Sequence, residues 1–254
     1  MDWAGTAVDY GCFAPVEAFV ESFKAIGTPV TVAETRTHMG LTKIEEVRAL
    51  FGIGHVKSDF HVKYGRDYDE NDVQECYKKF QEELFRTLEY YSKPIPGVAD
   101  VISRLRKQGV KVGSTTGYTR GMMDVVVPAA AAHGYIIDNC ETSDNLPGGR
   151  PKPYMIYQNM CRLDIPSTRS VVKVGDTVSD IKEGVNAGAW SVGVILGSNE
   201  LALTEKEVAE MPADELRERM KDVRYRMYAA GADYVIDGIE ELPMLIDCIN
   251  SINS

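Results

Sequence analysis

From about residue 97 onward, short apolar runs typical of strands alternate with segments in which apolar residues recur at helical spacing. The first helical stripe lies in residues 97–108, and Gly109 is placed to end it. We expect Pro128 to kink or break the helix that contains it. Strands are expected at residues 110–115, 135–139, 170–175, 190–196 and 232–236, and helices at 119–134, 153–163 and 180–187. This alternation predicts an α/β fold with a doubly wound, Rossmann-like parallel sheet.

Residues 13–92 differ, because they look entirely helical. Pro15 suits the first position of a helix that ends before Gly27, and Thr31 with Glu34 forms a capping box for the next helix. A third helix is expected over residues 43–50 and a long fourth over 72–91, whose aromatic stripe is most simply core packing. We expect two domains. An α/β core takes residues 1–12 and 93–254, and a helical cap takes residues 13–92.

Composition excludes several classes of protein. The chain has 38 acidic and 28 basic residues, a net charge of −10, which makes nucleic acid or an anionic membrane a poor partner. No apolar run approaches the roughly 18 residues of a membrane span, and the N-terminus has no basic-then-apolar signal. The five cysteines form no CxxC pair, which suits reduced thiols. We expect a cytoplasmic protein that acts on a small molecule and binds neither nucleic acid nor membrane.

Four short segments carry chemical groups, and each ends or follows a predicted strand, where open α/β sheets place their ligands. Alone, each has an ordinary explanation, such as Asp180 capping a helix. Together they offer a carboxylate nucleophile, hydroxyl and amide groups for phosphate oxygens, a cation, and a carboxylate pair for a hard metal ion. The segments are residues 2–6 (DWAGT), 114–118 (STTGY), 149–152 (GRPK) and 175–180 (GDTVSD).

These segments resemble the haloacid dehalogenase superfamily. With residues 8–15 (VDYGCFAP), 39–43 (MGLTK), 113–119 (GSTTGYT) and 173–180 (KVGDTVSD), the chain is similar, over essentially its whole length, to the phosphonoacetaldehyde hydrolase family, the phosphonatases. The resemblance implies a haloacid dehalogenase core with a helical cap and Mg²⁺ as cofactor. It also implies hydrolysis of the P–C bond of phosphonoacetaldehyde to acetaldehyde and phosphate. A homodimer is implied too, formed through cap helices such as residues 15–27, although packing within one chain explains that apolar face equally well.

The resemblance assigns roles to individual residues. Asp2 attacks phosphorus, and Asp2, the carbonyl of Ala4 and Asp176 hold Mg²⁺, with Asp180 close by. For Cys12 and Met39, simple apolar packing remains as good an explanation as substrate contact. Substrate contacts are implied for Thr116, the Gly117 amide, Arg150 with Lys152 as its fallback, Gly40, Met39, Tyr118 and Cys12.

Ala4 and Lys43 separate this chemistry from that of phosphatases. Phosphatases of the superfamily carry an aspartate general acid where this chain has Ala4, and losing such an acid typically costs about 10²–10⁴ in rate. The resemblance makes Lys43 a catalytic residue. Its amine can condense with an aldehyde to form an iminium, which accepts the electrons released when the P–C bond breaks. A lysine at the start of a solvated helix is otherwise the ordinary explanation of Lys43.

Two positions depart from the family pattern. The family has a histidine, read as a proton shuttle, where this chain has Glu46, one helical turn after Lys43. Glu46 can be a catalytic base, water can take that role, or activity can be weakened, since a carboxylate beside Lys43 favours its ammonium form.

The second departure is the first core strand, because only Met1 precedes Asp2. That strand appears truncated, and our hypothesis is that the native chain has about ten more residues. The alternatives to a phosphonatase are a phosphatase or phosphomutase of the same superfamily, and a catalytically impaired, truncated relic.

Overall fold

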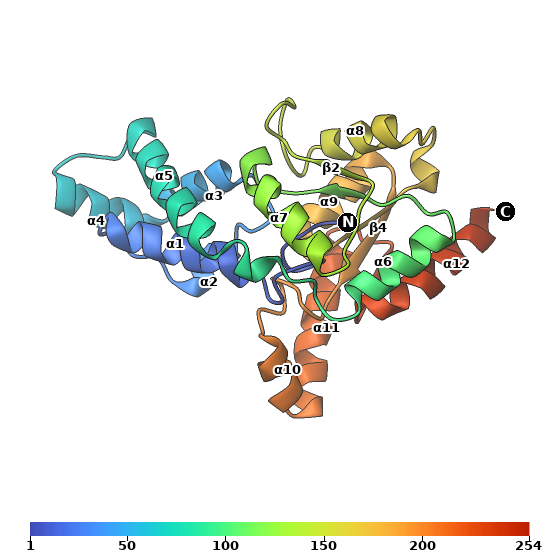
Figure 1. Ribbon diagram of the computed structural model, residues 1–254. Coiled ribbons are helices and arrows are strands. Elements are labelled where there is room, and N and C mark those ends of the chain that lie inside the picture. The colour runs from blue at the N-terminus through green and yellow to red at the C-terminus, as the bar shows by residue number, and fades with distance from the viewer. Residues whose placement is uncertain (254) are drawn as a thin grey trace.

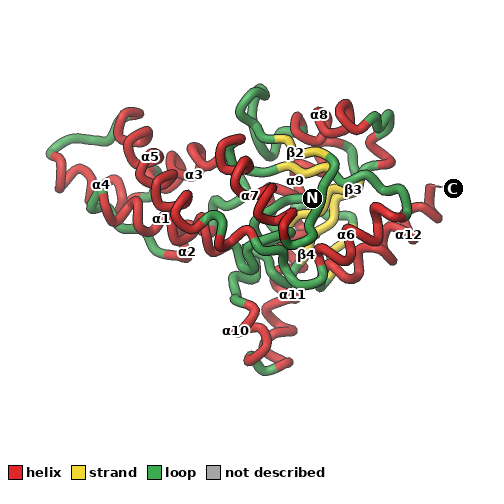
Figure 2. Tube along the Cα trace, in the orientation of Figure 1, coloured by secondary structure: helices red, strands yellow, loops and turns green. Residues whose placement is uncertain are grey.

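The computed structural model describes residues 1–253 and consists of a group of helices beside an α/β body (Figures 1 and 2). Five helices, α1 to α5, form the group, and α1 packs against α2 and α5 while α3 packs against α2, α4 and α5. Their bounds are Phe13–Ala25 (α1), Val32–Arg36 (α2), Lys43–Phe51 (α3), Gly54–Tyr64 (α4) and Glu70–Thr87 (α5), followed by a 3₁₀ turn at Tyr90–Ser92.

Aromatic packing holds this helical group together. Phe19 of α1 stacks on Phe80 of α5 with ring centroids 4.2 Å apart, and Phe23 packs against Phe51 of α3 at 5.1 Å. The apolar face of α1 is therefore covered by other helices of the same chain. This is the packing that the sequence allowed as an alternative to a homodimer contact. The expectation of four helices here was incomplete, because α4 was missed. Only Val56 and Phe60 of its residues are buried, so it has almost no apolar stripe to detect.

The α/β body follows the predicted alternation of helices and strands. Helix α8 packs on β1 and β2, α9 packs on β3 and β4, and α11 packs on β5. All strand pairs are parallel, as expected for a doubly wound α/β fold. The bounds are Val98–Lys107 (α6), Gly113–Thr115 (β1), Arg120–Ala132 (α7), Asn139–Glu141 (β2), Tyr154–Leu163 (α8), Val172–Gly175 (β3), Val178–Ala187 (α9), Trp190–Val194 (β4), Glu205–Glu210 (α10), Ala213–Ala229 (α11), Tyr234–Ile236 (β5) and Leu242–Asn253 (α12).

Among the described residues the strands form two sheets rather than one, with orders β1-β2 and β3-β4-β5. Met1 and Asp2 lie between them. The Met1 amine donates to the Gly113 carbonyl at 3.0 Å, and the Thr115 amide donates to the Met1 carbonyl at 3.1 Å. On the other side, the Asp2 amide donates to the Val174 carbonyl at 3.0 Å. These two residues occupy the end of a central strand position that is otherwise open in the described chain.

One expectation about elements of the body was wrong, and another was wrong in part. The second strand is β2 at Asn139–Glu141 rather than residues 135–139. Tyr135 is buried before this strand, with its ring edge-on to Trp3 and 5.1 Å between centroids. Helix α7 continues through Pro128 instead of breaking there. Pro128 is exposed, while Val126 and Ala130 on either side are buried, so packing of the neighbouring turn holds the helix together.

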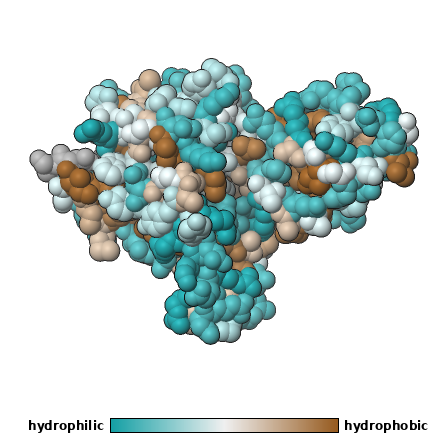
Figure 3. All heavy atoms as spheres, turned by 180° about the vertical axis from the view of Figure 1, so that it is seen from behind, coloured by the Kyte–Doolittle hydropathy of each residue, from teal (hydrophilic) through white to brown (hydrophobic). Residues whose placement is uncertain are grey.

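The hairpin of α10 and α11 projects from the body and is largely hydrophilic in the view from behind (Figure 3). A capping box of Thr204 and Glu207 begins α10, as its sequence pattern indicates. Among the described residues, none of the helices combines the length and the apolar character that crossing a bilayer requires.

Pro128 gives a test of the helix. Replacing it by alanine restores an amide that can donate to the Asp124 carbonyl, and removes the clash of the proline ring. Proline is about 3 kcal/mol less favourable than alanine inside a helix, and the more flexible unfolded chain offsets about 1 kcal/mol of this. We expect Pro128→Ala to raise the free energy of unfolding by about 1–2 kcal/mol in urea denaturation. Pro212→Ala, just before α11, restores no such bond and is the control. Equal effects of the two substitutions would contradict the argument.

Candidate active site

Three carboxylates converge where the central strands end. Asp2 follows the Met1 bridge, Asp176 follows β3, and Asp180 lies in the first turn of α9, where a capping box with Thr177 fixes it. All three are buried, and one oxygen of each lies within 4.8 Å of the others. The structure thus brings together the side chains predicted as nucleophile and metal ligands. Ala4, whose carbonyl is a predicted metal ligand, pairs with Val8 of the same loop in an isolated β-bridge.

Arg150 lies among these carboxylates and is itself buried. Its guanidinium forms an ion pair with Asp2 and donates to the Thr115 carbonyl at 2.7 Å. The same group lies 3.1 Å from an oxygen of Asp180 and 3.2 Å from one of Glu183. Arg150 is therefore held by several acceptors at once. Lys152, the fallback for its predicted role, is exposed instead.

Lys173 and Glu183 complete the network, and sequence analysis gave neither a role. The Lys173 amine lies 2.8 Å from Asp180 and 3.0 Å from Glu183, and donates to the Thr115 hydroxyl at 2.7 Å. A signal for both was present in the sequence. Lys173 is a charge within a strand of otherwise apolar residues, and Glu183 lies one helical turn after Asp180.

The network carries more negative than positive charge. Four carboxylates and two cations leave two negative charges unbalanced when all are ionised; the members are Asp2, Asp176, Asp180, Glu183, Arg150 and Lys173. The Met1 amine adds little positive charge at neutral pH, because burial, assisted by the charge of Lys173, lowers its pKa to about 5. A buried site two charges short of neutrality is suited to a divalent cation.

The carboxylates differ in protonation for identifiable reasons. Burial, followed by the charges of Asp2 and Asp180, raises the pKa of Asp176 well above its ordinary value. Burial alone would also raise the pKa of Asp180, but Arg150 and Lys173 outweigh it and lower the pKa to about 2. Repulsion from the neighbouring carboxylates thus opposes ionisation of Asp176, whereas the two cations favour ionisation of Asp180.

Hydrogen bonds and close backbone contacts fix Asp176 in place. Its oxygens accept from the Thr6 hydroxyl and the Asn199 amide, each at 2.8 Å. Gly5 has a φ of +84°, and a Cβ there would lie 2.2 Å from an Asp176 oxygen, so only glycine fits. The loop after Asp2 therefore closes directly over Asp176.

The residues present fit a hard metal ion such as Mg²⁺. All the side-chain donors are carboxylate oxygens, the ligands that Mg²⁺ prefers. One oxygen of Asp180 already lies 2.8 Å from the Lys173 amine and 3.1 Å from the Arg150 guanidinium. The oxygens of Asp2, Asp176 and Asp180 that lie within 4.8 Å of one another are placed to serve as ligands.

Lys43 and Glu46 form a second buried pair, in the helical group. Both are in the first turn of α3, and they are only 5% and 1% exposed. The Lys43 amine donates to both Glu46 oxygens, at 2.8 and 3.0 Å. Burial, which Lys43 opposes, raises the pKa of Glu46 to about 7. Lys43 is therefore not the solvated lysine that its position at a helix start suggests.

Apolar and aromatic side chains surround the Lys43 amine. The ring of Tyr118, from the loop after β1, lies 5.5 Å away, and that of Phe19 lies 5.8 Å away. The sulfur of Met39 is 3.9 Å from the amine. Burial, then the charges of Asp9, Cys12, Glu46 and Asp2, raise the pKa of Tyr118 well above its ordinary value. Tyr118 thus lies within electrostatic range of both Glu46 and Asp2.

Two glycines let the helical group approach the body closely. A Cβ on Gly40, whose φ is +94°, would lie 2.4 Å from the Thr177 hydroxyl oxygen. A Cβ on Gly117 would lie 2.3 Å from the Leu41 carbonyl. The contact between residues 40–41 and the loops after β1 and β3 therefore requires glycine, which has no side chain, at positions 40 and 117.

The remaining predicted substrate residues lie at this junction. Thr116 is buried, and its hydroxyl accepts from the Tyr118 amide at 3.0 Å. Cys12 is buried, and its surroundings, chiefly burial and then Asp9 and Asp176, raise its thiol pKa well above the ordinary value. Asp9, which had no predicted role, accepts from the Phe13 and Ala14 amides at the start of α1.

The chain matches known proteins over its whole length. A family model described as haloacid dehalogenase-like hydrolase matches residues 1–188, and a related model matches residues 148–242. A protein from Bacteroides fragilis named phosphonoacetaldehyde hydrolase is 55% identical over 251 residues, which is 99% of this chain and 95% of the relative. The chain belongs to the phosphonoacetaldehyde hydrolase family. A family member of that name from Bacillus cytotoxicus is 53% identical over 98% of this chain and 94% of its own.

Solved structures agree with this family assignment. The crystal structure of a phosphonoacetaldehyde hydrolase-like protein from Oleispira antarctica superposes with a TM-score of 0.95 at 36% identity, covering 98% of this chain and 91% of its own. A β-phosphoglucomutase from Clostridium difficile has a TM-score of 0.69 at 12% identity, over 99% of this chain and 96% of its own, and shows the shared fold alone. The α/β haloacid dehalogenase fold predicted from the sequence is confirmed.

The carboxylate cluster predicts how the protein responds to metal. We expect millimolar Mg²⁺ to raise the melting temperature by several degrees, because the ion binds the folded state. Asp176→Asn removes one ligand and should abolish most of that rise without lowering the melting temperature of the ion-free protein. The exposed substitution Asp214→Asn, on α11, should keep the full rise. If Asp176→Asn responds to Mg²⁺ like the unchanged protein, the cluster is not the metal site.

Proposed function

We propose that this chain hydrolyses the P–C bond of phosphonoacetaldehyde, giving acetaldehyde and phosphate, with Lys43 and Asp2 as its covalent catalysts. The observation that carries the proposal is the enclosure of the Lys43 amine at the junction with the body, beside Tyr118 and its neighbour Thr116. An amine that is to react with a carbonyl must be shielded from water and placed beside the bound substrate. Family membership supports the same activity, since relatives at 53–55% identity carry that name.

Each step conserves atoms and electrons. The Lys43 amine condenses with the aldehyde carbon and releases water, which leaves a protonated iminium. A carboxylate oxygen of Asp2 then attacks phosphorus, and the P–C bond breaks. Its electron pair moves into the iminium, which becomes a neutral enamine. Protonation and hydrolysis of the enamine release acetaldehyde and the free lysine, and water cleaves the aspartyl phosphate to release phosphate.

The other residues bind and orient the substrate. In this proposal the Thr116 hydroxyl and the Gly117 amide donate to the phosphonate oxygens. Arg150 supplies positive charge to the same phosphonate group. Mg²⁺ held by Asp2, Asp176 and Asp180 would neutralise phosphonate charge. Burial beneath the helical group excludes water from Lys43, which favours the condensation.

Ala4 argues against the phosphatase and phosphomutase alternatives. Its methyl group cannot protonate an alkoxide leaving group, whereas the enamine route needs no acid at that position. The structural resemblance to a phosphoglucomutase does not favour them, because at 12% identity it reflects the fold alone. If the chain is a catalytically impaired relic, Lys43 should not react with the substrate. Trapping of an imine on Lys43 with borohydride tests this alternative.

Lys43→Arg keeps the positive charge but cannot form an imine. We expect it to lower turnover of phosphonoacetaldehyde to the background level while leaving the melting temperature nearly unchanged. Borohydride added with substrate should attach a reduced two-carbon group to Lys43, found by peptide mass spectrometry. Lys57→Arg, on the exposed face of α4, is the matched control and should keep both turnover and the adduct. Turnover by Lys43→Arg, or no adduct on the unchanged protein, would overturn the proposal.

Glu46 should determine the pH dependence. We propose that its carboxylate accepts the proton of the Lys43 ammonium, which requires Glu46 to be ionised. Its pKa is raised to about 7, so it is protonated below that pH and able to act as a base above it. We expect kcat/KM to rise through about pH 7 and then level off, and expect Glu46→Gln to lack that rise.

Glu45→Gln is the control for this measurement. Glu45 neighbours Glu46 on α3 but is exposed, and it accepts from the Thr42 hydroxyl at 2.8 Å. This variant should show the same rise near pH 7 as the unchanged protein. A rise that persists at the same pH in Glu46→Gln would assign the proton transfer to water instead.

A further inference from the structure

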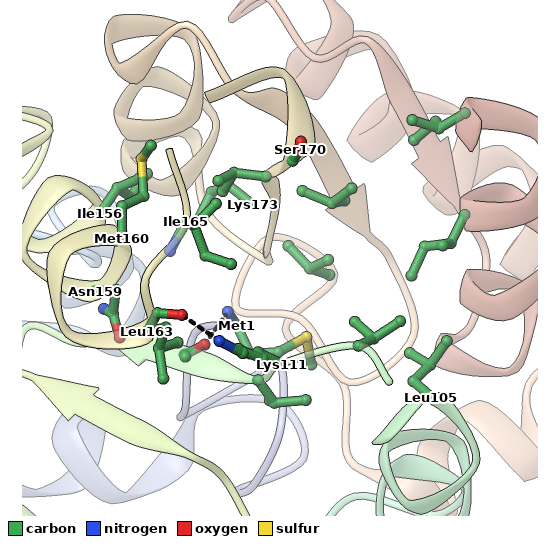
Figure 4. Close-up of a pocket in the computed structure, with 18 of the residues that line it drawn as sticks. Met1, Leu105, Lys111, Ile156, Asn159, Met160, Leu163, Ile165, Ser170 and Lys173 are labelled. Carbon is green, nitrogen blue, oxygen red and sulfur yellow. Dashed lines mark hydrogen bonds between the residues drawn. The ribbon is translucent and has the colours of Figure 1, made fainter. Parts of the chain in front are cut away.

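A substrate can reach the buried Lys43 amine only if the helical group and the body separate. Lys43 is 5% exposed, and Glu46 beside it is 1% exposed. The body contains a cavity of about 700 Å³, but the described residues that line it include neither Lys43 nor any acidic side chain. Its walls are largely apolar, with Ile156 and Met160 of α8 and Leu105 of α6 among them (Figure 4). The contacts that hold the junction closed therefore control access to the amine.

Asn199 lies at this junction, in the loop that follows β4, and is only 4% exposed. Its side-chain carbonyl accepts from the Arg36 guanidinium at 2.9 Å, and its side-chain amide donates to the Arg36 carbonyl at 3.3 Å. Its backbone amide donates to an oxygen of Asp176 at 2.8 Å. One residue of the body thus contacts both the last residue of α2 and a carboxylate of the proposed metal site.

Arg36 also contacts the connection between the body and α1. The nitrogen that donates to Asn199 donates to the Gly11 carbonyl at 2.8 Å as well, and the guanidinium lies over the Phe13 ring, 4.8 Å from its centroid. The other terminal nitrogen of Arg36 is buried and has no hydrogen-bond partner among the described residues. Because water would satisfy that nitrogen, its burial opposes closure, and the contact can open as well as close.

The loop after β4 is held in place on the body side. The Ser198 hydroxyl accepts from the Leu201 amide at 2.9 Å, and the Gly197 carbonyl accepts from the Gly11 amide at 2.7 Å. A Cβ on Gly11, whose φ is +86°, would lie 2.7 Å from the Leu203 carbonyl. The loop therefore offers Arg36 a fixed surface rather than a mobile one.

The contact with Asn199 lies at one end of a short loop, and Lys43 lies at the other end. The Arg36 carbonyl, which accepts from Asn199, also accepts from the Met39 amide at 3.3 Å. The Met39 sulfur in turn lies 3.9 Å from the Lys43 amine. Anchoring Arg36 therefore fixes the start of the segment that carries Lys43 to the junction.

We propose that Arg36 and Asn199 form a latch that holds the helical group closed over the site and keeps the Lys43 amine in place. They are positioning residues, because neither takes part in the covalent steps. Their contribution to turnover rests on the proposed function, whereas the latch itself does not. A substrate bonded to Lys43 and bound to the body through its phosphonate would favour the same closed state.

Thiol labelling of Cys12 measures opening without substrate. Cys12 is buried at the junction, within electrostatic range of Lys43 from the helical group and of Asp176 from the body. Cys76 is also buried, but it lies on α5 inside the helical group, so it should label only when that group unfolds. N-ethylmaleimide followed by peptide mass spectrometry distinguishes the two thiols.

We expect Arg36→Met and Asn199→Ala each to raise the labelling rate of Cys12 about tenfold, since a hydrogen bond to a charged group is worth about that factor in an equilibrium constant. The rate at Cys76 should not change. The charge of Arg36 lowers the pKa of Cys12, so its loss alone would slow labelling, and faster labelling reports opening. Arg48→Met, whose ion pair with Glu70 lies within the helical group, is the control and should leave Cys12 unchanged.

The double variant tests whether the two residues act as one unit. A single latch predicts that Arg36→Met with Asn199→Ala labels Cys12 no faster than the faster single variant. Multiplied effects would contradict the proposal, because they would mean two independent contacts. An unchanged Cys12 rate in both single variants would also contradict it, and so would equal acceleration at Cys76, which reports unfolding.

Kinetics separate the latch from a direct role in the chemistry. Asn199→Ala keeps the backbone amide that donates to Asp176, so the carboxylates should still act. The substrate must then close the junction without the latch, and we expect KM to rise about threefold or more while kcat stays within about twofold. A fall in kcat at unchanged KM would overturn the proposal by assigning Asn199 to the chemistry at Asp176. Absence of turnover by the unchanged protein would instead contradict the proposed function, and the labelling result would stand by itself.

Discussion

The buried contact between Arg150 and the carboxylates determines much of this site. Four acidic groups in one apolar interior would repel one another and favour protonation, yet Asp180 keeps a pKa of about 2 because Arg150 and Lys173 lie beside it. Arg150 holds Asp2 in the same network. Removing the arginine would leave several uncompensated charges buried, which costs more than the ion pairs contribute. The Asp2 carboxylate is thus positioned by charge balance as well as by the backbone.

The second constraint is desolvation of the Lys43 and Glu46 pair. In water their attraction would simply keep the lysine charged. Buried, the carboxylate has a pKa of about 7, so it gains and loses its proton near neutral pH. That environment depends on the contact of residues 40–41 with the body, which Gly40 and Gly117 permit. The helical group therefore both delivers the amine and sets its surroundings.

Sequence patterns predicted most of this architecture because apolar periodicity reports burial directly. Strands β3 to β5 and helices α6, α8 and α9 lie close to their expected bounds. Helix α4 could not be found, since only two of its residues are buried. Tyr135 suggested the start of a strand because aromatic residues are enriched in strands, although here it is buried outside one. The motifs identified the carboxylates and Lys43, but burial of Lys173 and Glu183 in one network is a long-range property. The spacing of residues along the sequence does not predict which distant charged side chains will lie together in the fold.

Met1 and Asp2 join the two sheets beside the site. The Asp2 backbone is held by one hydrogen bond, which its amide donates to the Val174 carbonyl, and by the pairing of Met1 with β1. Hydrogen bonds at a strand end open more readily than those within a continuous ladder. Displacement of a reacting group by about 1 Å can cost about 10²-fold in rate. The hydrogen bonds of Met1 and Asp2 to the two sheets therefore govern how precisely the Asp2 carboxylate is aimed.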